Sequence, residues 1–379
     1  MENPLEPVSF PKVMFTDGKQ TGCLKSLKKT NLSFCDEAAS FLQSGFWGSF
    51  KAGFGWEALA FSVEWECGTE NTSKTALETK PLLVLCRKVA FGLSLAYIPW
   101  GPELPEEIPR FKAMNELAVS LKVLLPKGTV LIRFDPPWFV EGLQPSTLPK
   151  PFIDSLVDIQ APDTVIIDLS QSIESIIGNM KAKWRYNARL AQKKGVRVFQ
   201  ADEEKLGVFY DLLVETAKRD IISIHSFDYY KTLFETSNIK GDKPELRLYL
   251  AEHEEEVIAG IVTIFRGKQA VYLYGASSDK KRNLMAPYTL QLKAIEDAKS
   301  FGCENYDLYG ISPSDDPSHP MAGLYRFKTG FGGMIKHHLG CWDYPCNQIV
   351  YYLFRLAEYL RKMIMLFKKN YLRSSSKRK

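Results

Sequence analysis

The chain has 379 residues, of which 45% are hydrophobic and 25% charged, and its formal net charge is +5. This length allows two domains with full cores, and the composition is that of an ordinary soluble globular protein. The charge is uneven, because residues 355–379 carry nine Lys or Arg and one acid, which gives this tail +8 and leaves −3 for the rest. The body of the protein is therefore not that of a general nucleic-acid coating protein.

The first half predicts a mixed α/β unit. Apolar residues at helical spacing predict helices over residues 36–45 and 110–124. Strand patterns cover residues 58–65, 82–86, 93–97 and 129–134. The Pro-rich residues 99–109 form a loop, and Pro-interrupted residues 145–162 connect the halves.

The second half opens with a strand over residues 164–168 and a helix over residues 173–194, which Gly195 closes as its C-cap. Further helices are predicted over residues 203–216, 227–235 and 287–301. Further strands are predicted over residues 196–199, 246–253, 256–265, 269–276 and 305–308. The three strands between residues 246 and 276 form an antiparallel meander.

A meander before a central helix fits a Gcn5-like acetyltransferase fold, and the first half gives a looser version of the same order. We therefore predict an α/β protein with two tandem Gcn5-like N-acyltransferase (GNAT-like) domains with mixed sheets. The domains cover residues 1–160 and 161–345, and residues 346–379 form a basic amphipathic C-terminal helix and tail.

The seven cysteines include no Cys-x-x-Cys pair, which argues for reduced thiols and against a disulfide scaffold or zinc ribbon. The five histidines form no ligand motif, since His337 and His338 are adjacent. We expect no metal site. The N-terminus has no basic start or apolar run, and no stretch of 18 uncharged apolar residues occurs, so neither a signal peptide nor a spanning helix is expected.

One lysine near the C-terminus stands in an unusual setting. Residues 325–333 read Tyr-Arg-Phe-Lys-Thr-Gly-Phe-Gly-Gly, with Lys328 between two aromatic residues and before a Gly-rich turn. Glycines allow backbone to approach a ligand, aromatic rings stack on bases or sugars, and a partly desolvated ammonium can hold an anion or a developing oxyanion. A strand end followed by a turn would give the same pattern.

A predicted helix concentrates basic residues around Trp184 and Tyr186. They include Lys183, Arg185, Arg189 and Lys193. One interpretation is a solvated basic face. The other is a nucleic-acid surface, because amphipathic aromatics beside cations suit phosphates and bases, both of which a tRNA acceptor end offers.

Five blocks in this order resemble the FemABX family of peptidoglycan aminoacyltransferases. Those proteins carry an amino acid from aminoacyl-tRNA to the stem peptide of a cell-wall precursor. Four blocks lie at residues 41–51, 97–102, 183–189 with 193–196, and 272–277 with 282–287, and the fifth is the Phe-Lys block around Lys328. The likeness covers about residues 35–335. No heptad insertion is present, so the chain resembles the FemX-like form without a coiled-coil arm.

The resemblance assigns precursor binding to Lys51 and Arg219, and it also places Trp47 and Phe327 among the substrate-binding residues. An Arg suits bidentate phosphate contact. For Lys51 the alternative is a surface side chain whose stem covers an apolar wall, and for Arg219 it is an intramolecular pair with a carboxylate. Tyr274 resembles a substrate-lining tyrosine, although it would also suit core filling.

The resemblance also implies that Lys328, beside Phe327, is essential and lies near the aminoacyl ester. It would stabilise the oxyanion there, or hold the phosphate or ribose of the tRNA. Some accounts of the family assign the general base to an acid that follows the Gly-Pro of the first domain. In this chain Glu103 follows Gly101-Pro102, but the family's usual pattern of an apolar residue and then Asp is absent. Substrate-assisted proton transfer is the alternative.

These observations predict a tRNA-dependent aminoacyltransferase without a cofactor. Its partners would be aminoacyl-tRNA and a precursor that is UDP-linked (a UDP-MurNAc-peptide) or lipid-linked, and we expect a monomer. One alternative is a CoA-dependent N-acyltransferase, although residues 278–283 lack the Gly-x-Gly that grips a pyrophosphate. The other is a non-catalytic binding protein that retains the double fold.

The C-terminal tail interleaves apolar residues with Lys and Arg over residues 349–372. This pattern predicts a basic amphipathic helix, which would lie on an anionic membrane surface where a lipid-linked precursor resides. The alternative is a docked helix with a disordered basic end at residues 374–379. We accordingly expect a cytoplasmic protein, or one held peripherally at the inner face of the cell membrane.

Overall fold

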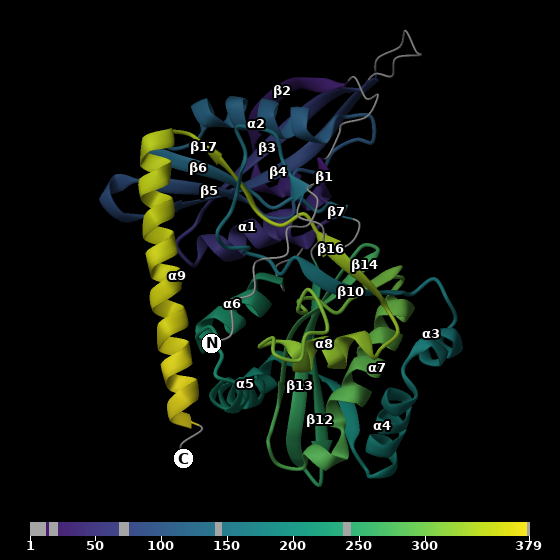
Figure 1. Cartoon of the computed structure of the whole chain (residues 1–379). Coiled ribbons are helices and arrows are strands. Elements are labelled where there is room, and N and C mark those ends of the chain that lie inside the picture. Colours follow the sequence, from purple (N-terminus) through teal and green to yellow (C-terminus); the bar gives the residue numbers. More distant parts are fainter. Residues whose placement is uncertain (1–12, 15–21, 68–75, 141–145, 238–243, 377–379) are drawn as a thin grey trace.

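The computed structural model describes residues 13–14, 22–67, 76–140, 146–237 and 244–376. Two mixed sheets dominate it, the upper one in Figure 1 built mainly from the first half of the chain and the lower one mainly from the second. A separate parallel pair joins β1 (Val13–Met14) to β8 (Ser146–Thr147). The tip of the predicted basic tail, residues 377–379, lies outside the described residues.

The first sheet has the strand order β2-β3-β4-β5-β6-β17-β9. Its parallel pair, β5 and β6, is connected by α2 (Arg110–Leu124), and its other pairs are antiparallel. The strands are β2 (Cys23–Thr30), β3 (Glu57–Cys67), β4 (Ala76–Lys88), β5 (Ser94–Ile98), β6 (Thr129–Phe134), β17 (Trp342–Pro345) and β9 (Ile153–Asp154).

The second sheet has the order β11-β12-β13-β14-β15-β10-β16-β7. Its parallel pair, β14 and β15, is connected by α7 (Ala286–Phe301), on which α4 (Ala182–Lys193) packs. The strands are β11 (Arg197–Ala201), β12 (Glu245–His253), β13 (Glu256–Arg266), β14 (Gln269–Ser277), β15 (Asn305–Asp307), β10 (Asp163–Asp168), β16 (Met334–His338) and β7 (Phe139–Val140). The predicted antiparallel meander is confirmed by the pairing of β12, β13 and β14.

Both sheets repeat one pairing order. The series β3-β4-β5-β6-β17 and the series β12-β13-β14-β15-β10 each run antiparallel, antiparallel, parallel, antiparallel. The predicted fold class, two tandem α/β units with mixed sheets, is confirmed. The chain also crosses between the sheets, because β7 of the first half pairs in the second sheet and β17 near the C-terminus completes the first.

The two halves share a core. One cluster lies between α2 and the first sheet, and another lies between α4, α7 and the second sheet. A third joins the halves, with Phe46 and Phe50 from α1 (Gly45–Ala52) meeting residues of α5 (Leu206–Asp220) and α6 (Phe227–Ser237). A site at this boundary is therefore built by both halves.

Two helix predictions were wrong in detail. Residues 36–45 were predicted as a helix, but the chain forms short 3-10 turns at Leu32–Glu37 and Phe41–Gln43, and α1 begins only at Gly45. Its start is fixed by Ser44, whose hydroxyl accepts the N–H of Trp47 at 3.2 Å.

The predicted helix over residues 173–194 is broken in two. It forms α3 (Ile173–Asn179) and α4 (Ala182–Lys193), with Met180 extended between them. The N–H of Lys181 donates to the carbonyl of Gly330 at 2.9 Å, and this long-range bond takes the place of a helical one. The break therefore depends on tertiary structure and not on local propensity.

The C-terminal segment forms one helix, α9 (Gln348–Ser376), along the left flank in Figure 1. It is held to the first sheet by a buried ion-pair group, in which Arg133 contacts Asp343 at 2.7 Å and Glu358 at 3.0 Å. Among the residues that the structure describes, no helix combines the length and apolarity that a membrane span needs.

Candidate functional site

The second sheet opens at the end of its parallel pair. β14 and β15 pair only over Gln269–Val271 and Asn305–Asp307, whereas β14 continues to Ser277 without that neighbour. The strands therefore separate, and side chains from α8 (Ala322–Thr329) reach the opening. The opening is therefore bordered both by the backbone of the separated strands and by side chains of α8.

Lys328 lies at this opening and is only 6% exposed. Its Nζ donates to the carbonyls of Tyr309 at 2.7 Å and Gly310 at 2.9 Å, and lies 5.2 Å from the ring centre of Tyr272. Burial lowers the pKa of Lys328 to about 7, against the opposing effect of Asp307. The block that holds it is a helix and not the strand end that the sequence pattern also allowed.

The carbonyl partner Tyr309 is itself held in a strained conformation. Its φ of 56° is in the left-handed region, and its N–H donates to Asp307 Oδ1 at 2.7 Å. Its hydroxyl donates to Gln160, whose Nε2 donates to the hydroxyl of Tyr97 at 3.2 Å. Hydrogen bonds thus connect Tyr309, a carbonyl partner of Lys328, to Tyr97 of the first domain.

The chain of hydrogen bonds ends on a buried carboxyl. Tyr97 donates to Asp135 Oδ2 at 2.8 Å, and burial raises the pKa of Asp135 to about 7. Sequence reasoning singled out none of these residues as functional. Only Tyr97 carried a signal, as the first residue of the block at residues 97–102.

Two of the sequence blocks meet beside Lys328. Trp184 Nε1 donates to the carbonyl of Phe327 at 2.8 Å, and a Cβ on Gly330 would lie 2.1 Å from the Trp184 ring. The Phe327 ring packs against Tyr288 and Phe331, at centroid distances of 5.4 and 5.1 Å. Gly330 is therefore needed because only a residue without a side chain lets the indole approach so closely.

Lys51 lies within a cluster of aromatic rings at the domain boundary. Its Nζ is 5.4 Å from the ring of Trp47, 5.5 Å from that of Tyr229, 5.8 Å from that of Phe50 and 6.0 Å from that of Trp56. Burial, and to a smaller extent Arg87, lowers the pKa of Lys51 to about 8. The ammonium of Lys51 is thus stabilised by the aromatic rings but destabilised by loss of water. A bound anion would offset this loss.

Tyr274 links this cluster to the opening. It is partly buried, and its ring centre is 5.1 Å from that of Tyr230. Tyr229 is near enough to contribute to the raised pKa of Tyr274. Tyr309 is close enough to contribute to the raised pKa of Tyr274, whose main cause is burial. A run of tyrosines therefore extends from the neighbourhood of Lys51 to that of Lys328.

Arg219 is engaged in ion pairs. Its guanidinium contacts Asp220 at 2.9 and 3.0 Å, Asp279 at 3.2 Å and the carbonyl of Ser277 at 2.8 Å. It lines a pocket of ≈ 520 Å³ at the start of α7, together with Tyr272, Phe327 and Lys280. No contact among the described residues joins it to Lys51, so the two predicted phosphate partners are not in contact.

Glu103 lines a different pocket, of ≈ 1350 Å³, between the domains. Its Oε1 accepts the N–H groups of Ala39 at 2.9 Å and Ser40 at 3.2 Å, and burial raises its pKa. Asp307 and His338 line the same pocket. The pocket reaches Gly267 and Gln269 at the start of β14, the end of the parallel pair away from the opening, and Lys328 does not line it. No contact among the described residues joins Glu103 to Lys328, so the role of Glu103 as a base stays a prediction.

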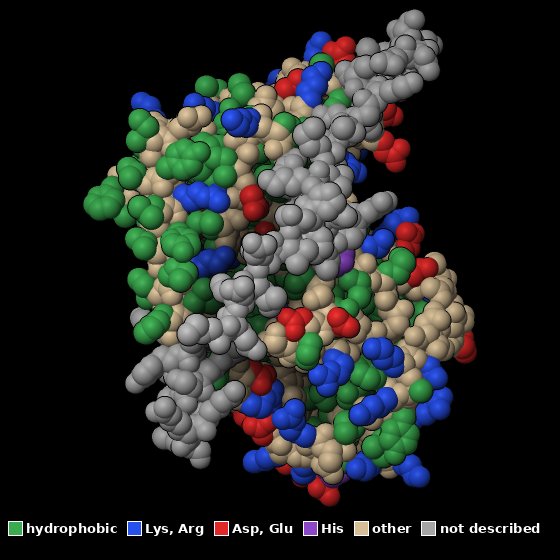
Figure 2. Space-filling view, in the orientation of Figure 1, with side chains coloured by type: hydrophobic (Ala, Val, Ile, Leu, Met, Phe, Trp, Pro, Cys, Tyr) green, Lys and Arg blue, Asp and Glu red, His purple; other side chains and the backbone are tan. Residues whose placement is uncertain are grey.

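The basic helix exposes one face. Lys183, Arg189 and Lys193 are exposed, as is Tyr186 at 62%, while Trp184 and its neighbours Asn187, Ala188 and Ala191 are buried. Figure 2 shows basic side chains gathered at the lower right, where α4 lies. Arg185 differs, because it donates to the carbonyls of Gly178, at 2.8 Å, and of Met180, and so braces the break between α3 and α4.

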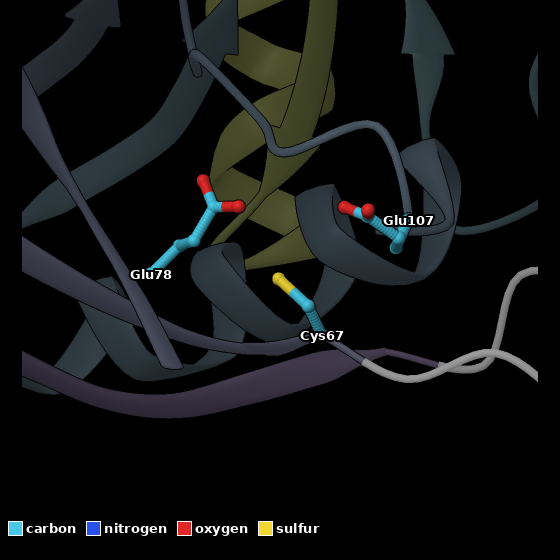
Figure 3. Close-up of side chains that lie close together, drawn as sticks. All are labelled: Cys67, Glu78 and Glu107. Atoms are coloured by element: carbon cyan, nitrogen blue, oxygen red, sulfur yellow. The ribbon is translucent and has the colours of Figure 1, made fainter. Parts of the chain in front are cut away.

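Cys67, Glu78 and Glu107 lie close together in the first domain (Figure 3), with their ligand atoms within 4.8 Å of one another. Burial raises the pKa of the Cys67 thiol, which keeps it protonated, and Glu78 pairs with Lys80 at 3.1 Å. A protonated thiol is a poor metal ligand. We assign no metal to this cluster.

The repeated pairing order and the opened parallel pair define a protein of two tandem GNAT-like domains. The crystal structure of FemX has this fold, with a TM-score of 0.70 over 87% of this chain and 100% of FemX, at 20% identity. The chain belongs to the FemAB family, which it matches over residues 153–243 and 237–359.

Curated relatives include proteins named lipid II:glycine glycyltransferase. That of Staphylococcus haemolyticus is 23% identical over 348 residues, covering 75% of this chain and 76% of the relative. That of Staphylococcus epidermidis is 23% identical over 253 residues, covering 52% of this chain and 61% of the relative. The chain thus matches less than two thirds of the length of the latter.

Proposed function

We propose that this protein is an aminoacyltransferase that joins an amino acid to the stem peptide of a peptidoglycan precursor, with aminoacyl-tRNA as the donor. The observation that carries the proposal is Lys328, a buried cation at the opening of the second sheet in a FemAB-family chain. The names of the relatives supply the reaction class and a lipid-linked acceptor.

In the proposed reaction an amine of the stem peptide attacks the carbonyl carbon of the aminoacyl ester. A C–N bond forms, the carbonyl oxygen becomes an oxyanion, and collapse breaks the ester C–O bond. The amine loses its proton and the leaving ribose hydroxyl gains one. Lys328 has three N–H donors when protonated, of which two bind carbonyls. The third would stabilise the oxyanion in a site sheltered from water.

The donor would approach from the side of α4 and α7. The exposed Lys183, Arg189 and Lys193 suit phosphates, and Tyr186 between them offers a stacking face. The pocket at the start of α7 adds Lys280 and Arg282 and borders Phe327 next to Lys328. Engagement of Arg219 by two carboxylates favours a role in shaping this pocket over direct phosphate binding.

The acceptor would enter from the domain boundary, with Lys51 as its phosphate partner. We assign this role to Lys51 because burial lowers its pKa, which means that its charged form is destabilised by loss of water. A bound phosphate would supply the negative charge that stabilises the ammonium. A lipid-linked acceptor would bring the protein to the inner face of the cell membrane.

Replacing Lys51 with Met should weaken acceptor binding about 10- to 100-fold, since a hydrogen bond to a charged group contributes about 1.5–3 kcal/mol. Methionine keeps the contact with the aromatic rings and removes only the charge. Isothermal titration with a UDP-linked precursor measures the effect, and Lys88→Met, which alters an exposed lysine on the same domain, is the control. Equal affinity of the Lys51 variant and the wild type would reject the phosphate role.

The rate should fall as the pH rises through about 7, the pKa of Lys328, because the ammonium form is present below this pH and lost above it. Asp307→Asn should move this fall to lower pH, since the carboxylate of Asp307 raises the pKa of Lys328. The amide oxygen can still accept the N–H of Tyr309. The measurement is the ratio of kcat/KM of variant and wild type between pH 5.5 and 9, which cancels the titration of the acceptor amine. A ratio that does not change with pH would contradict the assignment.

The direct test is incubation with charged tRNA pools and cell-wall precursors, with products identified by mass spectrometry. We expect an acceptor heavier by one or more amino-acid residues, and loss of this product after RNase treatment. Product formation from acetyl-CoA, insensitive to RNase, would support the CoA-dependent alternative. Tight precursor binding without any product would support the non-catalytic one.

A further inference from the structure

The helix α9 has one face turned to the first domain. Tyr351, Arg355, Glu358 and Lys362 follow one another at steps of four, three and four residues, which places them on one side of a helix. Arg355 donates to the carbonyl of Asp154 at 2.6 Å, and Lys362 to that of Leu156 at 2.7 Å. Glu358 binds Arg133, and Tyr351 is buried. This anchored face fixes the rotation of the helix about its axis.

The opposite face is apolar and exposed. We call it the free face of α9, and its seven side chains are between 47% and 77% exposed. They are Ile349, Leu353, Leu356, Leu360, Met363, Ile364 and Phe367. Figure 2 shows hydrophobic side chains gathered along the left flank, where α9 lies in Figure 1. An exposed apolar stripe of this length on a soluble domain marks a surface that contacts something else.

A second exposed group lies on the same flank. Phe91 is 99% exposed in the turn between β4 and β5, with φ 60° in the left-handed region. Leu93, two residues later, packs against the same buried cluster around Tyr351 as Val350 and Phe354 of α9 do. The turn extends past α9 in Figure 1. The apolar surface therefore includes a projecting aromatic ring beside the first turns of the helix.

The charge and shape of this flank favour an anionic lipid surface as its binding partner. The stripe follows a helix of 29 residues, about 44 Å long, and such a straight line of side chains fits a flat boundary. The segment from residue 355 to 379 has a net charge of +8, so an anionic surface attracts it whereas a second copy repels it.

We propose that the free face of α9 and Phe91 dock on the surface of an anionic bilayer, with the helix in the plane of the membrane. This goes beyond the transfer reaction, because docking needs neither the donor nor the acceptor. It would hold the domain boundary at a fixed orientation to the lipid, the position that a lipid-linked substrate requires.

The test is sedimentation of the full chain with vesicles of phosphatidylcholine containing 30% phosphatidylglycerol, and with phosphatidylcholine alone, in the absence of substrate. We expect binding to the anionic vesicles, reduced by raised salt, and at least tenfold weaker binding to the neutral ones. The double variant Leu360→Glu with Ile364→Glu should bind anionic vesicles at least tenfold more weakly. The matched control is Leu77→Glu with Met334→Glu, at positions 59% and 58% exposed on β4 and β16, and should bind as the wild type does.

Three outcomes would overturn the proposal. They are absence of wild-type binding to anionic vesicles at low salt, equal loss in the control variant, and a wild-type dimer that the α9 variant dissociates in sedimentation velocity. The last would assign the face to a second copy. Circular dichroism checks folding, and transfer to a soluble UDP-linked acceptor should be unchanged in the folded α9 variant. Failure of docking with intact transfer would leave the proposed reaction standing, and failure of transfer with intact docking would leave this inference standing.

Discussion

Replacing Lys328 with Met is expected to lower kcat by about 10²- to 10³-fold, the usual cost of removing one donor to an oxyanion. The side chain of Met has nearly the length of Lys but no N–H. KM should change little, because the ammonium contacts backbone carbonyls and the developing charge and not the distant parts of either substrate. Single-turnover rates with a saturating acceptor measure this loss.

The same change leaves two carbonyls without their donor, so a loss of stability must be separated from a loss of chemistry. Lys299→Met is the matched control, since Lys299 also donates to a backbone carbonyl, that of Leu169 at 2.8 Å. It should lower the midpoint of thermal unfolding without lowering kcat. Near-normal transfer by a folded Lys328→Met protein would remove this residue from the mechanism.

Replacing Arg133 with Leu should lower the free energy of unfolding by about 3–5 kcal/mol, because it leaves the buried carboxylate of Asp343 and the partly buried carboxylate of Glu358 without their cation. Arg133 is 4% exposed and contacts Asp343 through Nε and Nη2, at 2.7 and 3.0 Å. It also binds Glu358 through Nη1 and Nη2, at 3.0 and 3.1 Å. Urea unfolding followed by circular dichroism measures the effect.

The triple change Arg133→Leu, Asp343→Leu and Glu358→Leu tests the cause. If the loss in the single variant comes from unpaired charge, removing all three charges should restore most of the stability. A triple variant that is less stable than the single one would instead mean that the ion pairs themselves hold β6, β17 and α9 together.

Elements that depend on local pattern were predicted well. The helix over residues 110–124 and the strand over residues 129–134 were found with the predicted bounds. The helix has its own apolar spacing and follows Pro109, and the strand is a short apolar run that follows Gly128. The strand β17 was missed, since its four residues gain their place only by pairing with β6 about 200 residues earlier. The break at Met180 was missed for the same reason, as it depends on the carbonyl of Gly330.

The candidate site was predicted in part. The blocks around Lys328 and Trp184 were found from their residue types, and the structure brings them into contact. The backbone carbonyls that bind Lys328 could not be predicted from residue types, because every residue has a backbone carbonyl. The partners Gln160 and Asp135 were missed because a single buried polar residue in a loop or at a strand end looks like any other.

The exchange of β17 into the first sheet sets an order of assembly during synthesis. Until residues 342–345 leave the ribosome, β6 has no neighbour on one side, and at about 5–20 residues per second this lasts roughly 10 to 40 s. A bare apolar strand edge invites pairing with other chains. Arg133 lies on this edge, opposite the later position of Asp343. Until β17 is made, its positive charge would disfavour pairing of β6 with strands of other chains.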